Sequence, residues 1–410
     1  MIEPIAITAA SGVFPGANGP ETIDEFWRSV KAARRARLDS LEKKWGLRRS
    51  DYFDPAPGTP YRTYLDRAFT ISDSLGSQID WGVRVLKDLL HSVRGQMPAP
   101  SRTGLCLATS WTDSSYFHAD TSRVVGGASA VEGQVYAPDA QLQAIADAGG
   151  IEGPALAVDN ACASSLYALD TAIGMLFSGQ ADAVVVLGLN VFLPAFLYLG
   201  FSKLTALSPT GEILPFSADA SGIVPAEAAA AILVEPLGQA QASGRPMLAV
   251  IRGLGLSADG GERSIFAPGP IGQRLAYERA YREISPADIH YVEAHGTATV
   301  LGDQTEIEAL DAFFKPHRRN ARLPIGSVKA LVGHSLACAG LVSIVKALCM
   351  LRDGVIPPHI PVQPNPRLAD SCLRLPEEIE PWPEDEPVRR VGVSSFGFGG
   401  ANAHLVLESN

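Results

Sequence analysis

A single cysteine lies where a predicted strand gives way to a predicted helix, in the segment AVDNACASSLYALD. The strand is expected to end near Asp159, Asn160 to cap the helix, and Cys162 to lie in the first helical turn. Free backbone N–H groups and the helix dipole favour a thiolate there, as in a strand–turn–helix nucleophile elbow. A free cysteine is about as often a buried structural side chain, so these residues alone leave both interpretations open.

Two histidines follow predicted strands in the second half of the chain. His295 lies in YVEAHGTATVLGDQTEIEAL, and His334 lies in GSVKALVGHSLACAG, five residues after Lys329. Turns between strands and helices are where α/β sheets bind ligands. The alternatives are a surface turn for His295 and a surface lysine capping a strand end for Lys329.

A glycine-rich loop, SSFGFGGANAHLVLE, lies close to the C-terminus. Gly397, Gly399 and Gly400 permit conformations that other residues avoid, so backbone can approach a substrate closely. A phosphate cradle is disfavoured, because no Lys-Ser or Lys-Thr pair follows and the next element is a strand.

Together these segments resemble the β-ketoacyl synthases of the thiolase superfamily, and in particular the polyketide-type ketosynthases. The matching motifs are DNACASS, EAHGTAT with GDQTEIEAL, GSVKALVGH and GFGGANAH, together with the opening PIAITAASGVFPGANGPETIDEFW and the segment FSKLTALSPTGEILPFSADASG. The resemblance implies an α/β thiolase fold, in which two similar halves form a layered αβαβα architecture. Because the chain ends just after GFGGANAH, a free-standing enzyme is expected.

The resemblance also implies a role for each residue of these motifs. Cys162 would be acylated by a thioester, with the backbone N–H groups of Cys162 and Phe398 as its oxyanion hole. His295 and His334 would donate hydrogen bonds to a malonyl-type thioester during loss of CO2, and Lys329 would keep both neutral by like-charge repulsion. The product would be a β-ketoacyl thioester in polyketide or fatty-acid-like biosynthesis.

Further site residues are expected around this centre. Phe398 resembles the gating aromatic of the family, with simple core packing as its alternative. The loop glycines and two threonines are expected to line the oxyanion hole and the substrate pocket (Gly397, Gly399, Thr297, Thr299). Neither a metal nor a redox cofactor is implied.

The sequence departs from the family at several places. Ala163 stands where serine is usual, and Asn160 stands where threonine is usual. The GEGAG segment is replaced by PAEAAAA, which keeps Glu227 but adds methyl groups to a close-packed segment. An acyltransferase that does not decarboxylate therefore stays open. A non-catalytic partner subunit is disfavoured because the nucleophile is present, and a degradative thiolase because no C-terminal catalytic cysteine is matched.

Strand and helix patterns alternate along the chain, as in an α/β sheet covered on both faces. Strands are expected at 4–8, 103–109, 155–158, 183–188, 229–234, 248–254, 289–293, 323–327, 389–394 and 404–408, and helices at 162–177, 304–314 and 336–352. Asp303 and Glu306 have capping-box spacing. The segment 236–247 divides the chain into an N-terminal half, 1–243, and a C-terminal half, 244–410, and 355–387 reads as a long surface connection.

Composition excludes several classes of protein. The 410 residues carry a net charge of −10, which argues against general nucleic-acid binding. The five cysteines are irregularly spaced and suggest neither a zinc ribbon nor a disulfide framework. The N-terminus lacks the basic region of a signal peptide, so a cytoplasmic location is expected.

Residues 183–202 contain no charge and are long enough to span a membrane. Glycine, asparagine and proline interrupt them, so a buried strand followed by an apolar loop is favoured and no membrane contact is expected. Four of the apolar side chains are expected to line the acyl pocket or the adjoining dimer interface (Phe192, Phe196, Leu197, Phe201).

The expected partners follow from the resemblance. They are an acyl carrier protein, acyl and malonyl-type thioesters, and a second copy of the chain, with a heterodimer left open. Lys203 and the basic run 317–322 are candidates for carrier docking, with a solvated loop as the alternative. The strand 155–158 would pair across the two-fold axis.

Overall fold

The computed structural model describes residues 3–72, 77–93, 96–110, 138–260, 267–318, 321–382 and 388–410. Eleven of the described strands form one sheet, in the order β12-β10-β9-β14-β15-β8-β1-β7-β6-β4-β5. In that order the strands are Leu373–Arg374, Leu323–Gly326, Tyr291–Glu293, Arg390–Gly397, Ala401–Glu408, Ala249–Ala258, Ile5–Val13, Ala228–Pro236, Ala183–Asn190, Thr103–Thr109 and Ala155–Val158. Every strand predicted from the sequence is present.

The same pattern of strand directions occurs twice in this sheet. From β5 to β1 two parallel pairs are followed by two antiparallel pairs, and from β10 to β8 the same sequence of pairings recurs. The two sets meet where β1 pairs with β8 over Ile5–Ile7 and Ala249–Ile251. The chain is therefore built from two similar halves, as the resemblance implied. The boundary at 243/244 stays a prediction; it falls between α9 (Leu237–Ala242) and β8.

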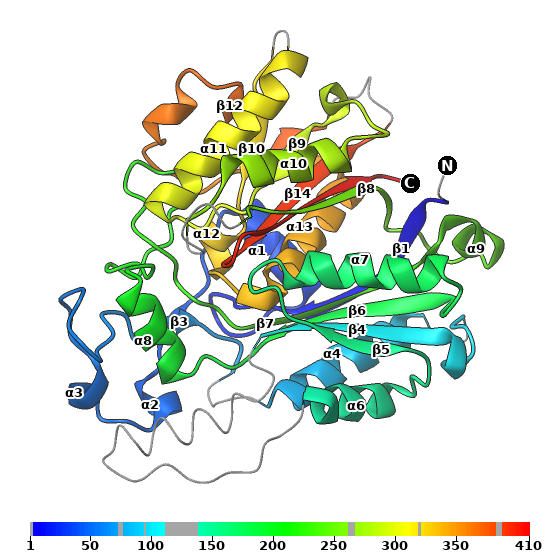
Figure 1. The fold of residues 1–410 in the computed structure, drawn as a ribbon, viewed down its shortest axis with the longest axis horizontal. Coiled ribbons are helices and arrows are strands. Elements are labelled where there is room, and N and C mark those ends of the chain that lie inside the picture. Colours follow the sequence, from blue (N-terminus) through cyan, green and yellow to red (C-terminus); the bar gives the residue numbers. More distant parts are fainter. Residues whose placement is uncertain are drawn as a thin grey trace.

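Helices separate and cover the two sets of strands (Figure 1). Helices α7 (Ser164–Phe177) and α13 (Ala339–Asp353) lie between them. Helices α4 (Gln78–Ser92) and α6 (Pro138–Gly149) cover the outer face of the N-terminal set, and α10 (Pro270–Ala280) and α11 (Val300–Phe314) cover that of the C-terminal set. This is the layered αβαβα architecture of the thiolase fold.

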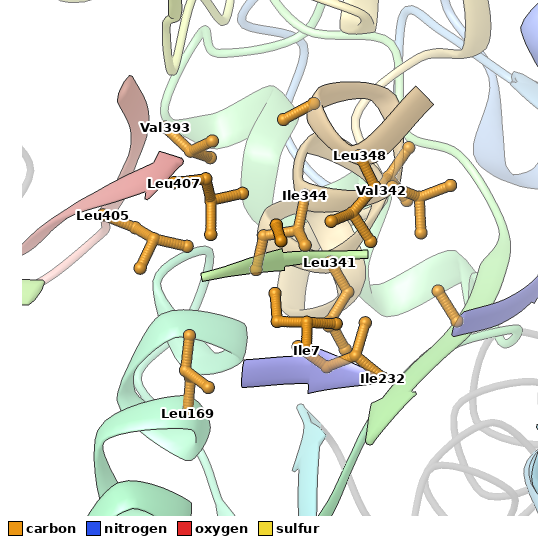
Figure 2. Close-up of a cluster of buried hydrophobic side chains, with 14 of the residues drawn as sticks. Ile7, Leu169, Ile232, Leu341, Val342, Ile344, Leu348, Val393, Leu405 and Leu407 are labelled. Carbon is orange, nitrogen blue, oxygen red and sulfur yellow. The ribbon is translucent and has the colours of Figure 1, made fainter. Parts of the chain in front are cut away.

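Helix α13 is the centre of the main hydrophobic cluster, and its residues 339–351 are all buried. Figure 2 shows side chains of this cluster from both sets of strands and both central helices: Ile7, Ile232, Val393, Leu405, Leu407, Leu169, Leu341, Val342, Ile344 and Leu348. Apart from Ser343 and Lys346 these residues are apolar, and a helix that is apolar on nearly all sides is expected to be buried. The two halves therefore share one core through α13.

The alanine run in β7 accommodates close packing on both of its faces. Ala228 and Ala230 belong to the cluster around α13, whereas Ala229 and Ala231 belong to the cluster beneath α4. Ala228 and Ala230, which carry two of the added methyl groups, are thus buried on the same face of the strand, because alternate strand residues face the same way.

The smaller elements connect these layers. They are α1 (Ile23–Lys31), β2 (Leu38–Ser40), α2 (Glu42–Trp45), α3 (Arg49–Tyr52), β3 (Arg67–Phe69), α8 (Ala195–Lys203), α12 (Lys329–Val332), β11 (Val355–Ile356) and β13 (Glu380–Pro381). The predicted connection 355–387 thus contains short strands, and residues 383–387 lie outside the described residues. The apolar run 183–202 forms β6, a loop and most of α8. Among the described residues, no helix combines the length and apolar composition that crossing a membrane requires.

Candidate active site

A cavity of about 470 Å³ brings together residues from both halves of the chain. Cys162, His295 and His334 all line it. Further lining residues include Thr297, Thr299, Gly397, Phe398, Asp259, Gln273, Glu306, Phe396 and Asn402. Motifs separated by more than a hundred residues in sequence therefore contribute to one site.

Cys162 lies in a tight turn between β5 and α7. Ala161 adopts a left-handed conformation with φ of 51°, and α7 begins only at Ser164, with Ala163 at its N-cap. The expected cap was wrong: the Asn160 backbone N–H donates to Ser164 Oγ (2.8 Å), and no side chain caps the helix. Cys162 therefore precedes the first helical turn rather than lying in it.

The turn around Cys162 packs closely against the C-terminal glycine loop. Ser395 Oγ donates a 2.7 Å hydrogen bond to the Cys162 carbonyl. A Cβ atom at Gly397 would lie 2.4 Å from the Asn160 carbonyl oxygen, so only glycine fits there. The close approach foreseen for this loop is thus a contact between the loop and the nucleophile turn.

The surroundings of the Cys162 thiol act on its pKa in opposite directions. Burial raises the pKa to about 11, while Lys329 and the backbone N–H groups of Phe398 and Cys162 itself lower it. The expected thiolate is thus not favoured, because desolvation outweighs Lys329 and the two N–H groups. Both N–H groups nevertheless point at the sulfur atom and so lie next to any group bound to it.

The two histidines face one another, with ring centroids 5.5 Å apart at an interplanar angle of 83°. Both are buried, so the surface-turn alternative for His295 was wrong. Burial, followed by the charge of Lys329, holds the pKa of both rings well below the usual value, which keeps them neutral. The Leu336 backbone N–H donates to His334 Nδ1 (3.3 Å), which leaves Nε2 as the N–H donor of that ring.

Lys329 is buried beneath the His295 loop rather than exposed at a strand end. Its Nζ donates a 2.7 Å hydrogen bond to the His295 carbonyl oxygen. Burial lowers its pKa, whereas the carboxylates of Glu293 and Glu306 raise it. The surface alternative for this lysine was therefore wrong.

Asp303 and Glu306 do not form the expected capping box. Helix α11 begins earlier, with Thr299 at its N-cap, and both carboxylates turn inward. Glu306 accepts the backbone N–H groups of His295 and Gly296, each at 2.7 Å. Asp303 accepts those of Phe216 (2.6 Å) and Ala298 (3.0 Å). Burial raises the pKa of both carboxyls to about 7.

Sequence reasoning also missed a buried ion pair behind the His loops. Lys346 Nζ contacts Glu293 Oε2 (2.5 Å) and Tyr291 Oη (2.8 Å), and Glu293 Oε1 accepts the Val328 backbone N–H (2.7 Å). The glutamate of VEAHG and a lysine near the middle of α13 were the only available signals. The ion pair joins β9 to α13, and the Val328 bond joins β9 to the turn before Lys329.

Only some of the residues expected in the substrate pocket line the cavity. Thr297 and Thr299 line the cavity with their hydroxyl oxygens 3.1 Å apart, and the half-buried Phe398 lines it as well. Gly399 does not line it, nor do the four apolar residues expected there (Phe192, Phe196, Leu197, Phe201). Leu197 packs in the same buried cluster as Cys162, and the Phe201 ring lies 5.8 Å from that of Phe398. Their role in acyl binding stays a prediction.

Among the described residues, no cluster of histidine, cysteine, aspartate or glutamate could hold a metal ion. The groups that the structure places at the cavity are a thiol and two neutral imidazoles, with the Lys329 amino group buried beneath the His295 loop.

Family models match nearly the whole chain. The β-ketoacyl synthase N-terminal domain matches residues 2–240, the C-terminal domain matches 248–363, and the ketoacyl-synthetase C-terminal extension matches 363–410.

Individual relatives come from polyketide synthases. The spectinabilin polyketide synthase system protein NorC of Streptomyces orinoci is 36% identical over 99% of this chain and 19% of its own length. Erythronolide synthase EryA2 of Saccharopolyspora erythraea is 32% identical over 99% of this chain and 12% of its own length. The chain thus spans about a fifth or less of these relatives.

Solved structures of ketosynthase domains are similar to this chain over its whole length. The oxazolomycin ketosynthase domain OzmH KS7 of Streptomyces albus superposes with a TM-score of 0.86 at 28% identity, covering 100% of this chain and 74% of that one. The module 6 ketosynthase of the Bacillus subtilis bacillaene synthase gives 0.84 at 26% identity, covering 100% and 72%. The chain belongs to the β-ketoacyl synthase family and has the thiolase fold of a ketosynthase domain.

Proposed function

We propose that this ketosynthase condenses an acyl chain bound to Cys162 with a malonyl-type thioester by decarboxylative Claisen condensation. The observation that carries the proposal is the meeting of Cys162 with two buried, neutral histidines at one cavity. Those groups match the two half-reactions, since one needs a nucleophile and the other needs hydrogen-bond donors for an enolate.

In the first half-reaction, Cys162 sulfur attacks the acyl thioester carbonyl. The C–S bond to Cys162 forms, the bond to the carrier sulfur breaks, and the carrier thiol leaves with the Cys162 proton. The backbone N–H groups of Cys162 and Phe398 stabilise the tetrahedral oxyanion, which is supported by their position at the sulfur.

In the second half-reaction, His295 and His334 donate hydrogen bonds to the carbonyl oxygen of the malonyl-type thioester. Its carboxylate leaves as CO2, and the electron pair forms an enolate. The enolate carbon attacks the acyl carbonyl, the Cys162 sulfur departs, and a β-ketoacyl thioester is released. The Leu336 N–H at His334 Nδ1 supports a donor role for Nε2.

Intact-mass analysis with acyl- and malonyl-loaded carrier proteins tests this function. An acyl mass on Cys162 followed by CO2 release and a β-ketoacyl product is the expected result. Acyl transfer to an oxygen or nitrogen acceptor without CO2 release would identify a ketosynthase-like acyltransferase instead. Absence of any acyl mass would point to a non-catalytic partner subunit.

We further propose that the carrier protein docks at the mouth of the cavity. Val300 and Leu301 are 57% and 56% exposed and line the cavity, as does Leu204, next to the exposed Lys203. Such a rim offers apolar contact with a cation beside it. The run 317–322, of which residues 319 and 320 lie outside the described residues, follows the far end of α11, roughly 20 Å from Val300. Lys203 is therefore the better placed candidate.

We propose a homodimer formed through β5, with a heterodimer as the alternative. This strand is the last of the sheet, and Leu156 is 50% exposed upon it. An open sheet edge presents unpaired backbone N–H and C=O groups that can pair with a strand of another chain. A cytoplasmic location is supported by the five unpaired cysteines, since thiols persist in reducing compartments.

A further inference from the structure

Gln273 is a buried amide in the wall of the active-site cavity. We propose that it binds substrate there, through a hydrogen bond between its side-chain amide and an N–H or O–H donor on the thioester. The inference rests on the proposed function, because it assumes that a thioester occupies this cavity.

The first observation is the burial of an unsatisfied polar atom. Gln273 is 1% exposed, and its Oε1 has no hydrogen-bond partner among the described residues. Buried amide oxygens are rarely left unpaired, because desolvation without a compensating hydrogen bond is unfavourable. Since Gln273 also lines the cavity, a bound molecule can supply the missing partner.

The second observation is that the neighbouring polar groups are already engaged with one another. Asn402 Nδ2 donates to Asp259 Oδ1 (2.7 Å), and the Gly269 backbone N–H donates to Asp259 Oδ2 (3.0 Å). A Cβ atom at Gly272 would lie 2.0 Å from Asp259 Oδ1, so the start of α10 is fixed against this pair. The backbone of Gln273 is thus held in place, while its side-chain Oε1 is left without a hydrogen-bond partner among the described residues.

The third observation links Gln273 to the reacting groups. Tyr277 lies one turn further along α10, and its ring centroid is 6.4 Å from that of Phe396. The Phe396 ring is in turn 5.4 Å from that of His295. This series of ring contacts positions the helix that carries Gln273 relative to the histidine that addresses the thioester carbonyl. A thioester held at His295 therefore extends within the cavity that Gln273 lines.

The required ligand chemistry is a hydrogen-bond donor, which a thioester can carry on either side of its sulfur. One source is the secondary amide N–H of the arm on which carriers hold acyl groups. The other is a hydroxyl group on the acyl chain. Rotation of the Gln273 amide exchanges its oxygen and nitrogen, so the same side chain can also donate to the amide carbonyl.

Four small thioesters separate the two sources. We would use butyryl and 3-hydroxybutyryl N-acetylcysteamine thioesters, each with a free amide N–H or with that nitrogen methylated. The measurement is the second-order rate constant for Cys162 acylation, followed by intact mass. In the wild-type protein, we expect removal of the donor that binds Gln273 to slow acylation about tenfold.

The test variant is Gln273→Met, which keeps the length of the side chain but removes the amide. We expect it to abolish the roughly tenfold preference for the donor-bearing thioester. Gln141→Met is the matched control: Gln141 is also buried with an unpartnered Oε1, but it lies on α6, away from the cavity. This control should retain the wild-type preference.

Loss of preference along the amide series assigns Gln273 to the carrier arm, and loss along the hydroxyl series assigns it to the acyl chain. Equal rates for all four thioesters in the wild-type protein would overturn the inference, whether or not the variants fold. So would a Gln273→Met protein that reacts with unchanged preference. Failure of every thioester to acylate Cys162 would instead refute the proposed function, and this inference with it.

Discussion

Cys162 and His295 line one cavity, but the chain around each is held by different kinds of partner. At Cys162 itself the contact is neutral, from the Ser395 hydroxyl to the Cys162 carbonyl, whereas the Asp159 carboxylate accepts the neighbouring Ala161 N–H at an exposed position. The His295 loop is fixed by buried ionisable groups, with Glu306 on its N–H groups and Lys329 on its carbonyl. The His295 loop thus depends on buried charged partners, and burial, followed by the charge of Lys329, keeps both histidines neutral.

Removing the nucleophile should have the largest effect. We expect Cys162→Ala to abolish the acyl-enzyme mass shift completely, because no other described cysteine lines the cavity. Intact-mass spectrometry after incubation with acyl-loaded carrier measures this. Cys372→Ala is the matched control and should still be acylated. A Cys162→Ala protein that gains the acyl mass would contradict the assignment.

The histidines should affect the second half-reaction more than the first. Replacing His295 or His334 with alanine removes a donor to the developing enolate, so CO2 release should fall by about 10²–10³-fold while some self-acylation persists. His359→Ala provides the control, since His359 is buried outside this cavity. Undiminished condensation in both active-site variants would show that His295 and His334 do not stabilise the enolate.

Glu306→Ala tests the comparison between charged and neutral supports directly. The substitution leaves the N–H groups of His295 and Gly296 buried without partners, so the free energy of unfolding should drop by about 3 kcal/mol. Ser395→Ala breaks one neutral bond at the cysteine turn and should cost about 1 kcal/mol. Denaturant unfolding of both variants provides the measurement. Equal decreases in the free energy of unfolding would show that the charged and the neutral contact stabilise the protein to the same extent.

The loss of stability at acidic pH should come mainly from buried histidines in the C-terminal half of the chain. Burial lowers the pKa of His404 to about 3 and that of His359 to about 4. Below pH 6.5 these histidines become protonated in the unfolded chain but stay neutral in the folded protein. Their contribution to the free energy of unfolding is therefore fully present above pH 6.5 and is lost as the pH falls towards 4. Each ring contributes a slope of about 1.4 kcal/mol per pH unit in this window.

The raised carboxyls act in the opposite sense. Asp303 and Glu306 titrate near 7 when folded, so their contribution is lost as pH rises from about 4.5 towards 7. Replacing His404 with phenylalanine isolates one histidine: the slope of unfolding free energy between pH 6.5 and 4 should decrease relative to the wild-type protein. An unchanged slope in denaturant titrations at several pH values would exclude His404 from the acid response.

The smallest effect is expected at the apolar helix beside the cysteine turn. Leu197 shares a buried cluster with Cys162, so Leu197→Trp should shorten the longest acyl chain that the enzyme accepts. Competition among acyl thioesters of increasing length measures this. Phe177→Trp, at a position that is already exposed at the end of α7, is the control. An unchanged chain-length profile would place the acyl pocket elsewhere.

Local patterns were sufficient to predict most of the strands. The ranges 103–109 and 155–158 agree with β4 and β5, because short apolar runs bounded by turn residues specify strands well. The start of α7 was predicted two residues too early, because the amino-acid sequence does not indicate that the backbone of Ala161 adopts a left-handed conformation. Motifs brought Cys162, His295, His334 and Lys329 to the candidate site, and all four are found around it.

Partners distant in sequence could not be read from local spacing. Asp303 and Glu306 fit a capping box, but the same spacing places both on one inward face of α11. Glu227 was noticed as a retained acid, whereas its buried partner Lys44 (2.6 Å) is 183 residues away. Gln273 belongs to no recognised motif, and only the structure shows that its unpaired Oε1 lies in a residue that lines the cavity.

The all-round burial of α13 has a consequence for biosynthesis. During translation the strands that carry Ile7 and Ile232 are made long before this helix, so the surface it will cover remains exposed in the nascent chain. Neither set of strands can complete its core until Ala339–Asp353 has been synthesised. Formation of the native state therefore depends on contacts between distant parts of the chain, which slows folding and extends the period of vulnerability to aggregation. The helix that unites the two halves therefore leaves the first half with an incomplete core until the second has been synthesised.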